Sequence, residues 1–238
     1  MNYVFKKNIY FAMVDIDGTI KDLVKENTNA LIRTMEFFDN INLKFRGRFV
    51  LFINKINMFF VKTGLLPTNK LMLNILLFIY SVMLLKRFKK FKSKYFEEYN
   101  KEHIFFEKAD EIINSINHNH LTIYMVTKNR QNKYIAKVKD VGNNFKCINS
   151  IYKIVVGKRN TIKYTVYKSL MQKNGIKKNE LVIIGDNFWD DILPAMLLGV
   201  KVIWCNMYNS NLKKSAINIL KLFNKNIYDY NDIKKYKN

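Results

Sequence analysis

The sequence contains little cysteine, proline or glycine: two cysteines, two prolines and eight glycines in 238 residues. Cys147 and Cys205 cannot form a framework of several disulfide bonds, and no closely spaced cysteine pair suggests a zinc site. The low glycine and proline content excludes a collagen-like chain, and a hydrophobic fraction of 49% excludes a disordered one. The composition is therefore that of a globular protein with a sizeable core, and its cysteine content is typical of a reducing compartment.

Acidic residues are also scarce, because 19 Asp and Glu stand against 41 Lys and Arg, for a formal charge of +22. Only six of the basic residues are arginine, whose planar guanidinium group is favoured in the recognition of bases and phosphates. The lysines occur together with many Asn, Ile and Tyr residues, a mixture that an A/T-rich coding sequence produces by itself. We therefore expect no specific nucleic-acid partner, only weak attraction to polyanions or anionic membranes.

Short apolar runs alternate with helical patterns over most of the chain. The runs lie at 9–14, 121–126, 181–184 and 200–204, and the helical patterns lie at 106–117, 132–138, 162–174 and 191–198. Continuous apolar strands that alternate with helices are typical of an α/β fold with a doubly wound parallel sheet. Active sites in such folds lie beyond the carboxyl ends of the strands, so the polar residues that follow the runs are the first candidates for chemistry.

The segment from about residue 21 to residue 107 does not alternate in this way and is predicted to be all-helical. Two apolar stretches, 49–61 and 71–85, flank a turn signal that contains Gly64 and Pro67, and the basic run 86–92 follows them. This pattern predicts a helical hairpin. Three interpretations stay open: a buried hairpin of an inserted domain, peripheral membrane contact through 43–92, and a membrane-spanning hairpin, although a spanning helix needs ~20 apolar residues.

Polar residues follow three of the apolar runs. Asp15 and Asp17 come directly after the first run, and Gly18 allows the chain to turn sharply there. Thr127 follows the second run, and Asp186 follows the third after one glycine. Two carboxylates with the spacing of the first pair can act as a nucleophile and a proton-transfer group, and they can begin a site for a hard cation.

These strand-end residues, in this order, resemble the motifs of the haloacid dehalogenase (HAD) superfamily of phosphohydrolases, which use an aspartate nucleophile. The matching stretches are 10–19 (YFAMVDIDGT), 124–127 (YMVT) and 183–192 (IIGDNFWDDI). The resemblance implies a HAD-like, Rossmannoid core over residues 1–20 and 108–238, with an all-α cap domain inserted over 21–107. The length and the apolar, basic middle of the insert are similar to caps of the phosphoserine-phosphatase-like branch.

The resemblance also implies catalytic roles. Asp15 corresponds to the nucleophile that forms an aspartyl-phosphate, and Asp17 corresponds to the general acid that protonates the leaving oxygen and later activates water. Thr127 and a lysine would hold the phosphoryl oxygens. Because superfamily members that are not phosphatases, such as ion-pumping ATPases and dehalogenases, lack the second aspartate, Asp17 favours a phosphatase, or a phosphomutase that uses the same residues.

Two lysines are candidates for the phosphate-neutralising residue. Lys163 lies 23 residues before Asp186, which suits the short spacing of the family. Lys158 lies 28 residues before Asp186 and follows Gly157, as in the frequent Gly-Lys element of the family, but no proline comes after it. The spacing favours Lys163, and Lys158 stays open as the alternative.

The same resemblance implies a Mg²⁺ cofactor. Its ligands would be the carboxylates of Asp15 and Asp186 and the carbonyl of Asp17. An outer acidic residue would complete the site. Asp191 is preferred for this position over Asp190, because Asp191 is followed by the Ile, Ala and Gly that follow it in relatives.

A phosphorylated small molecule is the implied substrate, either a metabolite or a lipid phosphate, and it would contact Thr127, Lys128 and Asn129. We expect a cytoplasmic protein, because the first apolar run is too short for a secretion signal, with an insert that could contact the inner face of the membrane. The alternative function is a membrane-surface protein in which the HAD core serves as a scaffold.

Overall fold

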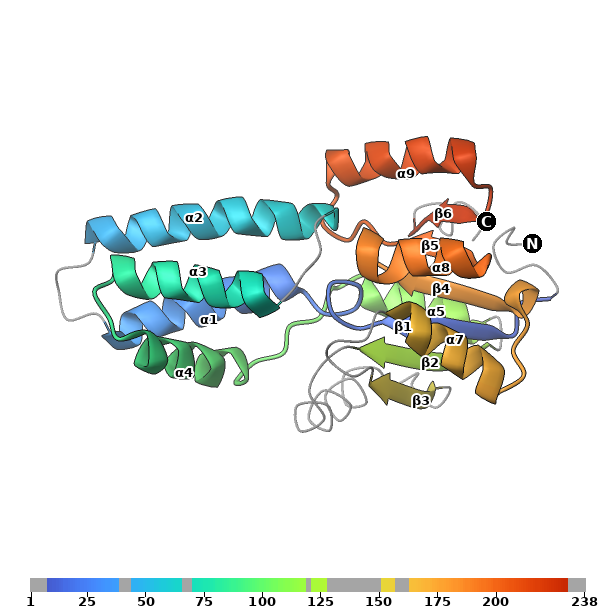
Figure 1. Ribbon diagram of the computed structural model, residues 1–238, viewed down its shortest axis with the longest axis horizontal. Coiled ribbons are helices and arrows are strands. Elements are labelled where there is room, and N and C mark those ends of the chain that lie inside the picture. The colour runs from blue at the N-terminus through green and yellow to red at the C-terminus, as the bar shows by residue number, and fades with distance from the viewer. Residues whose placement is uncertain are drawn as a thin grey trace.

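A computed structural model of the chain describes residues 8–38, 44–65, 70–118, 121–127, 151–156 and 163–230. Figure 1 shows an α/β part at one end of the molecule and a group of four helices at the other. The predicted helix at 132–138 lies outside the described residues. The arrangement confirms the α/β fold class with a parallel sheet.

A sheet of six parallel strands forms the centre of the α/β part, in the order β3-β2-β1-β4-β5-β6. The strands are β1 (Phe11–Asp15), β2 (Thr122–Thr127), β3 (Ile151–Val156), β4 (Leu181–Gly185), β5 (Lys201–Trp204) and β6 (Ile227–Asp229). Chain order runs outward from β1 in both directions, which is the doubly wound topology predicted from the sequence. The four predicted strands correspond to β1, β2, β4 and β5, whereas β3 and β6 were not predicted.

Helices cover both faces of the sheet, which explains the continuous apolar runs. On one face, α5 (Ala109–His118) packs its isoleucines against Ala12 and Val14 of β1. The other face, which includes Met13, is covered by three helices. These are α7 (Lys163–Lys173), α8 (Leu193–Leu198) and α9 (Asn211–Phe223). Two short helical segments, η2 (Lys178–Glu180) and η3 (Phe188–Ile192), flank β4.

The insert consists of α1 (Leu23–Phe38), α2 (Lys44–Thr63), α3 (Lys70–Met83) and α4 (Phe88–Tyr99). The two predicted apolar helices are α2 and α3, and they lie side by side (Figure 1). All four helices contribute to one hydrophobic cluster, which is separate from the two clusters of the sheet. The division into a core (1–20 and 108–238) and a cap (21–107) stays a prediction. None of the described helices combines the length and the apolar content needed to cross a membrane.

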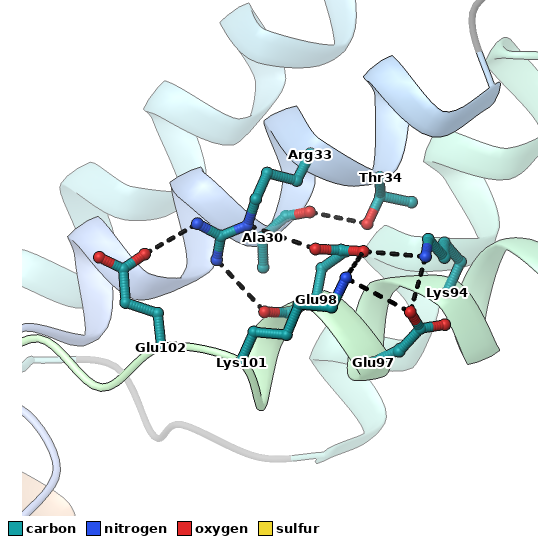
Figure 2. Close-up of polar contacts among 8 residues, drawn as sticks. All are labelled: Ala30, Arg33, Thr34, Lys94, Glu97, Glu98, Lys101 and Glu102. Carbon is teal, nitrogen blue, oxygen red and sulfur yellow. Dashed lines mark hydrogen bonds and ion pairs between the residues drawn. The ribbon is translucent and has the colours of Figure 1, made fainter.

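A network of ion pairs joins α1 to α4 (Figure 2). Glu98 is at its centre, and one of its carboxylate oxygens lies 2.9 Å from Lys94 Nζ and 2.6 Å from Lys101 Nζ. Arg33 contacts the other oxygen of Glu98 at 3.4 Å and donates a hydrogen bond to the Glu98 carbonyl at 3.2 Å. Arg33 also pairs with Glu102 at 2.8 Å. Each carboxylate in this network therefore has a basic partner within the insert.

Two chain segments connect the core to the insert, and a buried lysine joins them. Lys21 forms β-bridges to Asp17 and Phe105, and its ammonium group lies 2.8 Å from Glu26 Oε1 and 2.7 Å from His103 Nδ1. Because Lys21 and Glu26 are fully buried, their charges compensate each other at the connection. The connection places the insert next to the carboxyl ends of the strands.

Candidate active site

The polar residues predicted from the strand ends lie at one edge of the sheet. Asp15 ends β1 and Thr127 ends β2, while Asp186 follows Gly185 at the end of β4. The parallel register pairs Asp15 with Val126, so β1 and β2 end at the same level. In Figure 1 the arrowheads of β2 and β3 point toward the insert. The site therefore lies between the sheet and the four helices.

Lys163, the first residue of α7, lies at the centre of the site. Its Nζ is 2.6 Å from Asp15 Oδ1 and 2.6 Å from Asp191 Oδ1, and all three side chains are buried. The Tyr167 hydroxyl donates a hydrogen bond of 3.0 Å to the same oxygen of Asp191, whose other oxygen accepts the Asn187 N–H at 3.2 Å. The ammonium group therefore bridges the carboxylate at the end of β1 and the one in η3.

Three buried carboxylates converge beside this ammonium group. Oxygens of Asp15, Asp186 and Asp191 all lie within 4.8 Å of one another. The Thr19 hydroxyl donates a long hydrogen bond of 3.5 Å to Asp186. A cluster of carboxylate oxygens is the donor set that hard divalent cations such as Mg²⁺ prefer. The residues present are therefore chemically suited to hold Mg²⁺.

Two glycines allow the carboxylates to approach one another. Gly18 has a φ of +87°, and a Cβ atom there would lie 2.4 Å from Asp186 Oδ2. A Cβ atom at Gly185 would lie 2.3 Å from Asp191 Cγ. Neither distance is compatible with a side chain. At Gly18 and Gly185 the backbone therefore lies so close to the side chains of Asp186 and Asp191 that only glycine fits.

Asp17 and Thr127 form a second polar pair beside the cluster. The Thr127 hydroxyl donates a hydrogen bond of 3.3 Å to Asp17 Oδ2. Thr127 is fully buried, whereas Asp17 is half-buried and lines a cavity of about 110 Å³. The other residues around this cavity come from both parts of the molecule: Asp15, Leu23, Val61, Lys163, Asp186, Asn187 and Asp190. Asp17 and the buried carboxylate of Asp15 thus line the same small cavity.

Burial and mutual repulsion change the protonation equilibria of the site. Burial raises the pKa of Asp15 well above its ordinary value, and Asp191 and Asp186 add to this effect while Lys163 opposes it. Burial, with a contribution from Asp191, raises the pKa of Asp186 to about 7, against the opposing effect of Lys213. Burial by itself would lower the pKa of Lys163, but Asp15 and Asp191 outweigh it and raise this pKa. Burial and the neighbouring carboxylates thus outweigh the nearby lysines, and Asp15 and Asp186 hold their protons to a higher pH than usual.

Lys213 is a site residue that we did not predict from the sequence. Its fully buried ammonium group donates a hydrogen bond of 2.9 Å to the Cys205 carbonyl and lies 5.9 Å from the centre of the Trp204 ring. Burial lowers the pKa of Lys213, and the charge of Asp186 opposes this. One signal was available, because Lys213 precedes the buried Ile217 of α9 by one helical turn and so lies on its apolar face.

Tyr167 was also missed, and its sequence position explains how it reaches the site. It follows Lys163 by four residues in α7, so the two side chains lie on the same face of the helix. Among the predicted residues, Asp190 lines the cavity, while Asp191 is the one whose carboxylate joins the cluster. Lys128, Asn129 and Lys158 lie outside the described residues.

The C-terminal end of α2 covers one side of the site. The Phe188 N–H donates a hydrogen bond of 2.7 Å to the Gly64 carbonyl, and the Trp189 indole N–H donates one of 2.7 Å to the Leu65 carbonyl. A Cβ atom at Gly64 would lie 2.2 Å from the Asp186 carbonyl oxygen, while Val61 lines the cavity itself. The insert therefore forms part of the wall of the site.

Solved structures with the same fold are numerous, and three illustrate the likeness. YfnB from Bacillus subtilis, classed as a HAD hydrolase and solved bound to magnesium, has a TM-score of 0.62 at 17% identity, covering 90% of this chain and all of that one. A predicted phosphoglycolate phosphatase from Haemophilus somnus has a TM-score of 0.61 at 14% identity, covering 92% of this chain and 100% of that one. A Thermotoga maritima protein classed as a β-phosphoglucomutase has a TM-score of 0.60 at 13% identity, covering 90% of this chain and 99% of that one.

Comparison with curated protein sequences gives no match. Comparison with protein families matches residues 12–205 to the haloacid dehalogenase-like hydrolases. This range includes most of β1, Asp15 at its end and Asp17 just after it, the whole insert, α7 and the strand that precedes Asp186. The match covers most of the chain and includes every described residue of the acidic cluster. The protein therefore belongs to the haloacid dehalogenase-like hydrolase family.

Proposed function

We propose that this protein is a Mg²⁺-dependent phosphatase that hydrolyses a phosphate monoester through an aspartyl-phosphate intermediate. The observation that carries the proposal is the buried cluster of Asp15, Asp186 and Asp191 around the ammonium group of Lys163. A second carboxylate with proton-transfer capacity, Asp17, faces the same cavity. Membership of a hydrolase family supports the proposed reaction class.

Asp15 is the proposed nucleophile. Its Oδ1 is held by Lys163, which orients the carboxylate toward the cavity. A bond forms between an Asp15 oxygen and phosphorus as the ester P–O bond breaks, and Asp17 donates its proton to the leaving alcohol oxygen. Water then attacks the phosphorus, Asp17 takes a proton from that water, and inorganic phosphate leaves while the Asp15 carboxylate is restored.

Asp15 and Asp186 with the Asp17 carbonyl are the proposed Mg²⁺ ligands, and Asp191, or Asp190 as the alternative, is the outer acidic residue. When bound, Mg²⁺ supplies positive charge that reduces the repulsion between the Asp15 carboxylate and the phosphate ester. The raised pKa values of Asp15 and Asp186 support this proposal, because burial and neighbouring carboxylates make the ionised cluster unfavourable without an added cation. The magnesium-bound YfnB structure gives further support.

Lys163 and Thr127 are proposed to hold the phosphoryl oxygens. Lys163 lines the cavity and Thr127 is hydrogen-bonded to Asp17 at its edge. The cavity of about 110 Å³ is small, so we propose that the phosphate group of the substrate occupies it while the rest extends outward. Val24 and Lys62 line a larger cavity of about 330 Å³. They are the sequence neighbours of Leu23 and Val61, which line the small cavity. A phosphorylated small molecule fits this arrangement.

A phosphomutase is the second candidate, because the same residues transfer a phosphoryl group to a second hydroxyl when water is excluded. The Thermotoga maritima neighbour classed as a β-phosphoglucomutase supports this second candidate. Release of inorganic phosphate indicates the phosphatase, whereas conversion of one sugar phosphate into its isomer indicates the mutase. Placement in the phosphoserine-phosphatase-like branch and a cytoplasmic location stay predictions.

The proposal is tested by replacing Asp15 with Asn and measuring hydrolysis of a generic aryl phosphate in the presence of Mg²⁺. The amide keeps the shape of the side chain but is a poor nucleophile, so we expect turnover to fall by at least about 1,000-fold. Replacing Lys173, an exposed residue at the end of α7, with Gln is the matched control and should leave turnover unchanged. Wild-type activity in the Asp15 variant would refute the proposal.

A further inference from the structure

Helix α2 is apolar on two opposite faces, of which only one is buried. On the buried face, Val50 packs in the hydrophobic cluster of the insert, Asn54 forms hydrogen bonds with Thr28 and Tyr80, and Met58 is buried one turn further on. A second set of large apolar side chains is 43–57% exposed: Phe49, Phe52, Ile56, Phe59 and Phe60. Their spacing of three, four, three and one residues places them in a single stripe along the helix. A soluble helix normally carries polar residues on its outer face, so this stripe requires a different explanation.

Basic residues border the stripe on one side. Arg48, Lys55 and Lys62 are exposed and recur every seven residues, so they form a row next to the exposed phenylalanines. The sequence between Asp39 and Glu97 contains 12 lysine and arginine residues and no acidic residue. The outer face of α2 therefore combines aromatic rings with positive charge that no nearby acidic residue of this segment offsets.

Helix α3 repeats the pattern beside α2. Its exposed apolar side chains are Ile75, Phe78, Ile79 and Val82, which also lie on one face, and Leu85 follows at 73% exposure. Exposed basic residues come next, at Arg87, Lys89 and Lys90. Two adjacent helices of the insert thus present apolar stripes with basic margins.

We propose that the outer face of α2 and α3, defined by these two stripes and their basic margins, docks peripherally on an anionic lipid bilayer. The interfacial region of such a bilayer accepts aromatic and aliphatic side chains while its headgroups attract the flanking lysines and arginines. This docking is independent of the proposed phosphatase activity. Because α2 ends at the site, where Val61 lines the cavity, docking would bring the site close to the membrane surface.

Two other occupants agree less well with the observations. A second copy of the chain would have to place the same surface against itself in a two-fold dimer, and the segment 40–96 carries only positive charge. A partner that wraps around α2 would have to displace Val50 from the hydrophobic cluster of the insert and uncover the buried Met58. A flat, apolar and anionic surface avoids both conflicts.

Co-sedimentation with vesicles tests the proposal. We expect the protein to bind vesicles of phosphatidylcholine mixed with phosphatidylglycerol, and to bind phosphatidylcholine vesicles much more weakly. Added salt should weaken the binding, since it screens the attraction between the basic margin and the headgroups. Equal binding to both kinds of vesicle, or binding to neither, would overturn the proposal.

Variants identify the surface. The double replacement Phe52→Ser/Phe59→Ser should lower the partition coefficient at least about tenfold by removing two inserted rings. The double replacement Arg48→Gln/Lys55→Gln should lower it by about the same factor. Circular dichroism and aryl phosphate hydrolysis show whether each variant is folded.

Matched controls come from the core. Leu197→Ser removes an apolar side chain of α8 that is 67% exposed, and Lys168→Gln/Lys173→Gln removes two exposed charges of α7. Neither control should change vesicle binding. If the controls weaken binding as much as the α2 variants do, the outer face of α2 and α3 is not the docking surface. If the wild type forms a dimer that Phe52→Ser/Phe59→Ser disrupts and does not bind vesicles, a second copy is the occupant.

Discussion

Two groups of buried acidic residues, one in the insert and one at the strand ends, differ in how their charges are compensated. In the insert, Glu98 is contacted by Lys94, Lys101 and Arg33 at 2.6–3.4 Å. Hydrogen bonds from Lys101 and Lys94 lower the pKa of Glu98 below its ordinary value. At the strand ends, Asp15 shares Lys163 with Asp191, and its pKa is raised by burial and by neighbouring carboxylates.

The difference separates a structural use of charge from a functional one. The carboxylates of the insert find their counterions within the chain, so the network of Figure 2 joins α1 to α4 without an external ion. The carboxylates of the site keep a raised pKa despite Lys163, so they need protons or an added cation. Perturbed carboxylates that converge in a cavity are typical of catalytic sites. Four predictions test this contrast, in order of decreasing expected effect.

Replacing Lys163 with Met should have the largest effect. It leaves Asp15 and Asp191 buried without their shared cation, which costs about 3 kcal/mol or more of unfolding free energy. Turnover should fall at least about 1,000-fold, because Lys163 is the proposed neutralising group for the phosphoryl oxygens. Urea denaturation and aryl phosphate hydrolysis measure the two effects. Unchanged stability would mean that the acidic cluster does not depend on this lysine.

Replacing Gly18 with Ala should disrupt the cluster sterically, since the new Cβ atom would lie 2.4 Å from Asp186. Gly175 has a similarly positive φ of +64°, but nothing lies within 4 Å of the Cβ position. Gly175→Ala is therefore the matched control, with a cost of about 1 kcal/mol from backbone strain alone. We expect Gly18→Ala to cost more than this and to weaken Mg²⁺ binding. Equal costs in denaturation experiments would contradict the predicted close packing.

The pKa of Asp186 predicts how stability without Mg²⁺ depends on pH. Because this pKa is about 7 in the folded chain, against an ordinary value of 3.8, the folded chain holds a proton that the unfolded chain has released between these pH values. Raising the pH through this range therefore favours unfolding. Glu98, whose pKa is lowered, is ionised in both states above about pH 5.5 and adds no slope there.

Thermal denaturation in EDTA should accordingly show a melting temperature that falls as the pH rises from about 5.5 to about 7.5. The slope should be smaller in the Asp186→Asn variant, and Asp15, whose pKa is also raised, should account for the rest. A melting temperature that rises over this range in the wild type, or a slope that is undiminished in the variant, would show that Asp186 does not titrate as its burial indicates.

Replacing Glu98 with Gln should have the smallest effect. Arg33, Lys94 and Lys101 are partly exposed and can return to water, so the loss of stability should be less than about 1 kcal/mol and should shrink in high salt. Hydrolysis should be unchanged, because the network lies away from the cavity. A loss of activity comparable to that of Lys163→Met would abolish the distinction between the two regions.

Much of the fold could be predicted from the sequence, because central strands covered on both faces must be continuously apolar. That is true of β1, β2, β4 and β5, whose ends also identify Asp15, Thr127 and Asp186. The edge strand β6 has only three residues, too few to produce a pattern. The predictions therefore succeeded where burial is most complete.

Other parts of the site could not be predicted, since they depend on contacts between distant segments. The approach of Gly64 to Asp186 joins residues more than a hundred positions apart, and no local pattern encodes it. A prediction of Lys213 as a site residue would have required knowing which face of α9 packs against the sheet. Spacing favoured Lys163 over Lys158, and the structure places Lys163 between Asp15 and Asp191, while Lys158 lies outside the described residues.

The most direct test of the central claim is a calorimetric titration of the metal-free protein with Mg²⁺ at neutral pH. We expect one Mg²⁺ to bind per chain in the wild type, and binding to weaken at least about tenfold in Asp186→Asn, which removes one carboxylate of the cluster. Glu98→Gln, which removes a buried carboxylate of the insert, should bind Mg²⁺ as the wild type does. The absence of Mg²⁺ binding in the wild type, or equal binding by Asp186→Asn, would contradict the claim that this acidic cluster is a metal site.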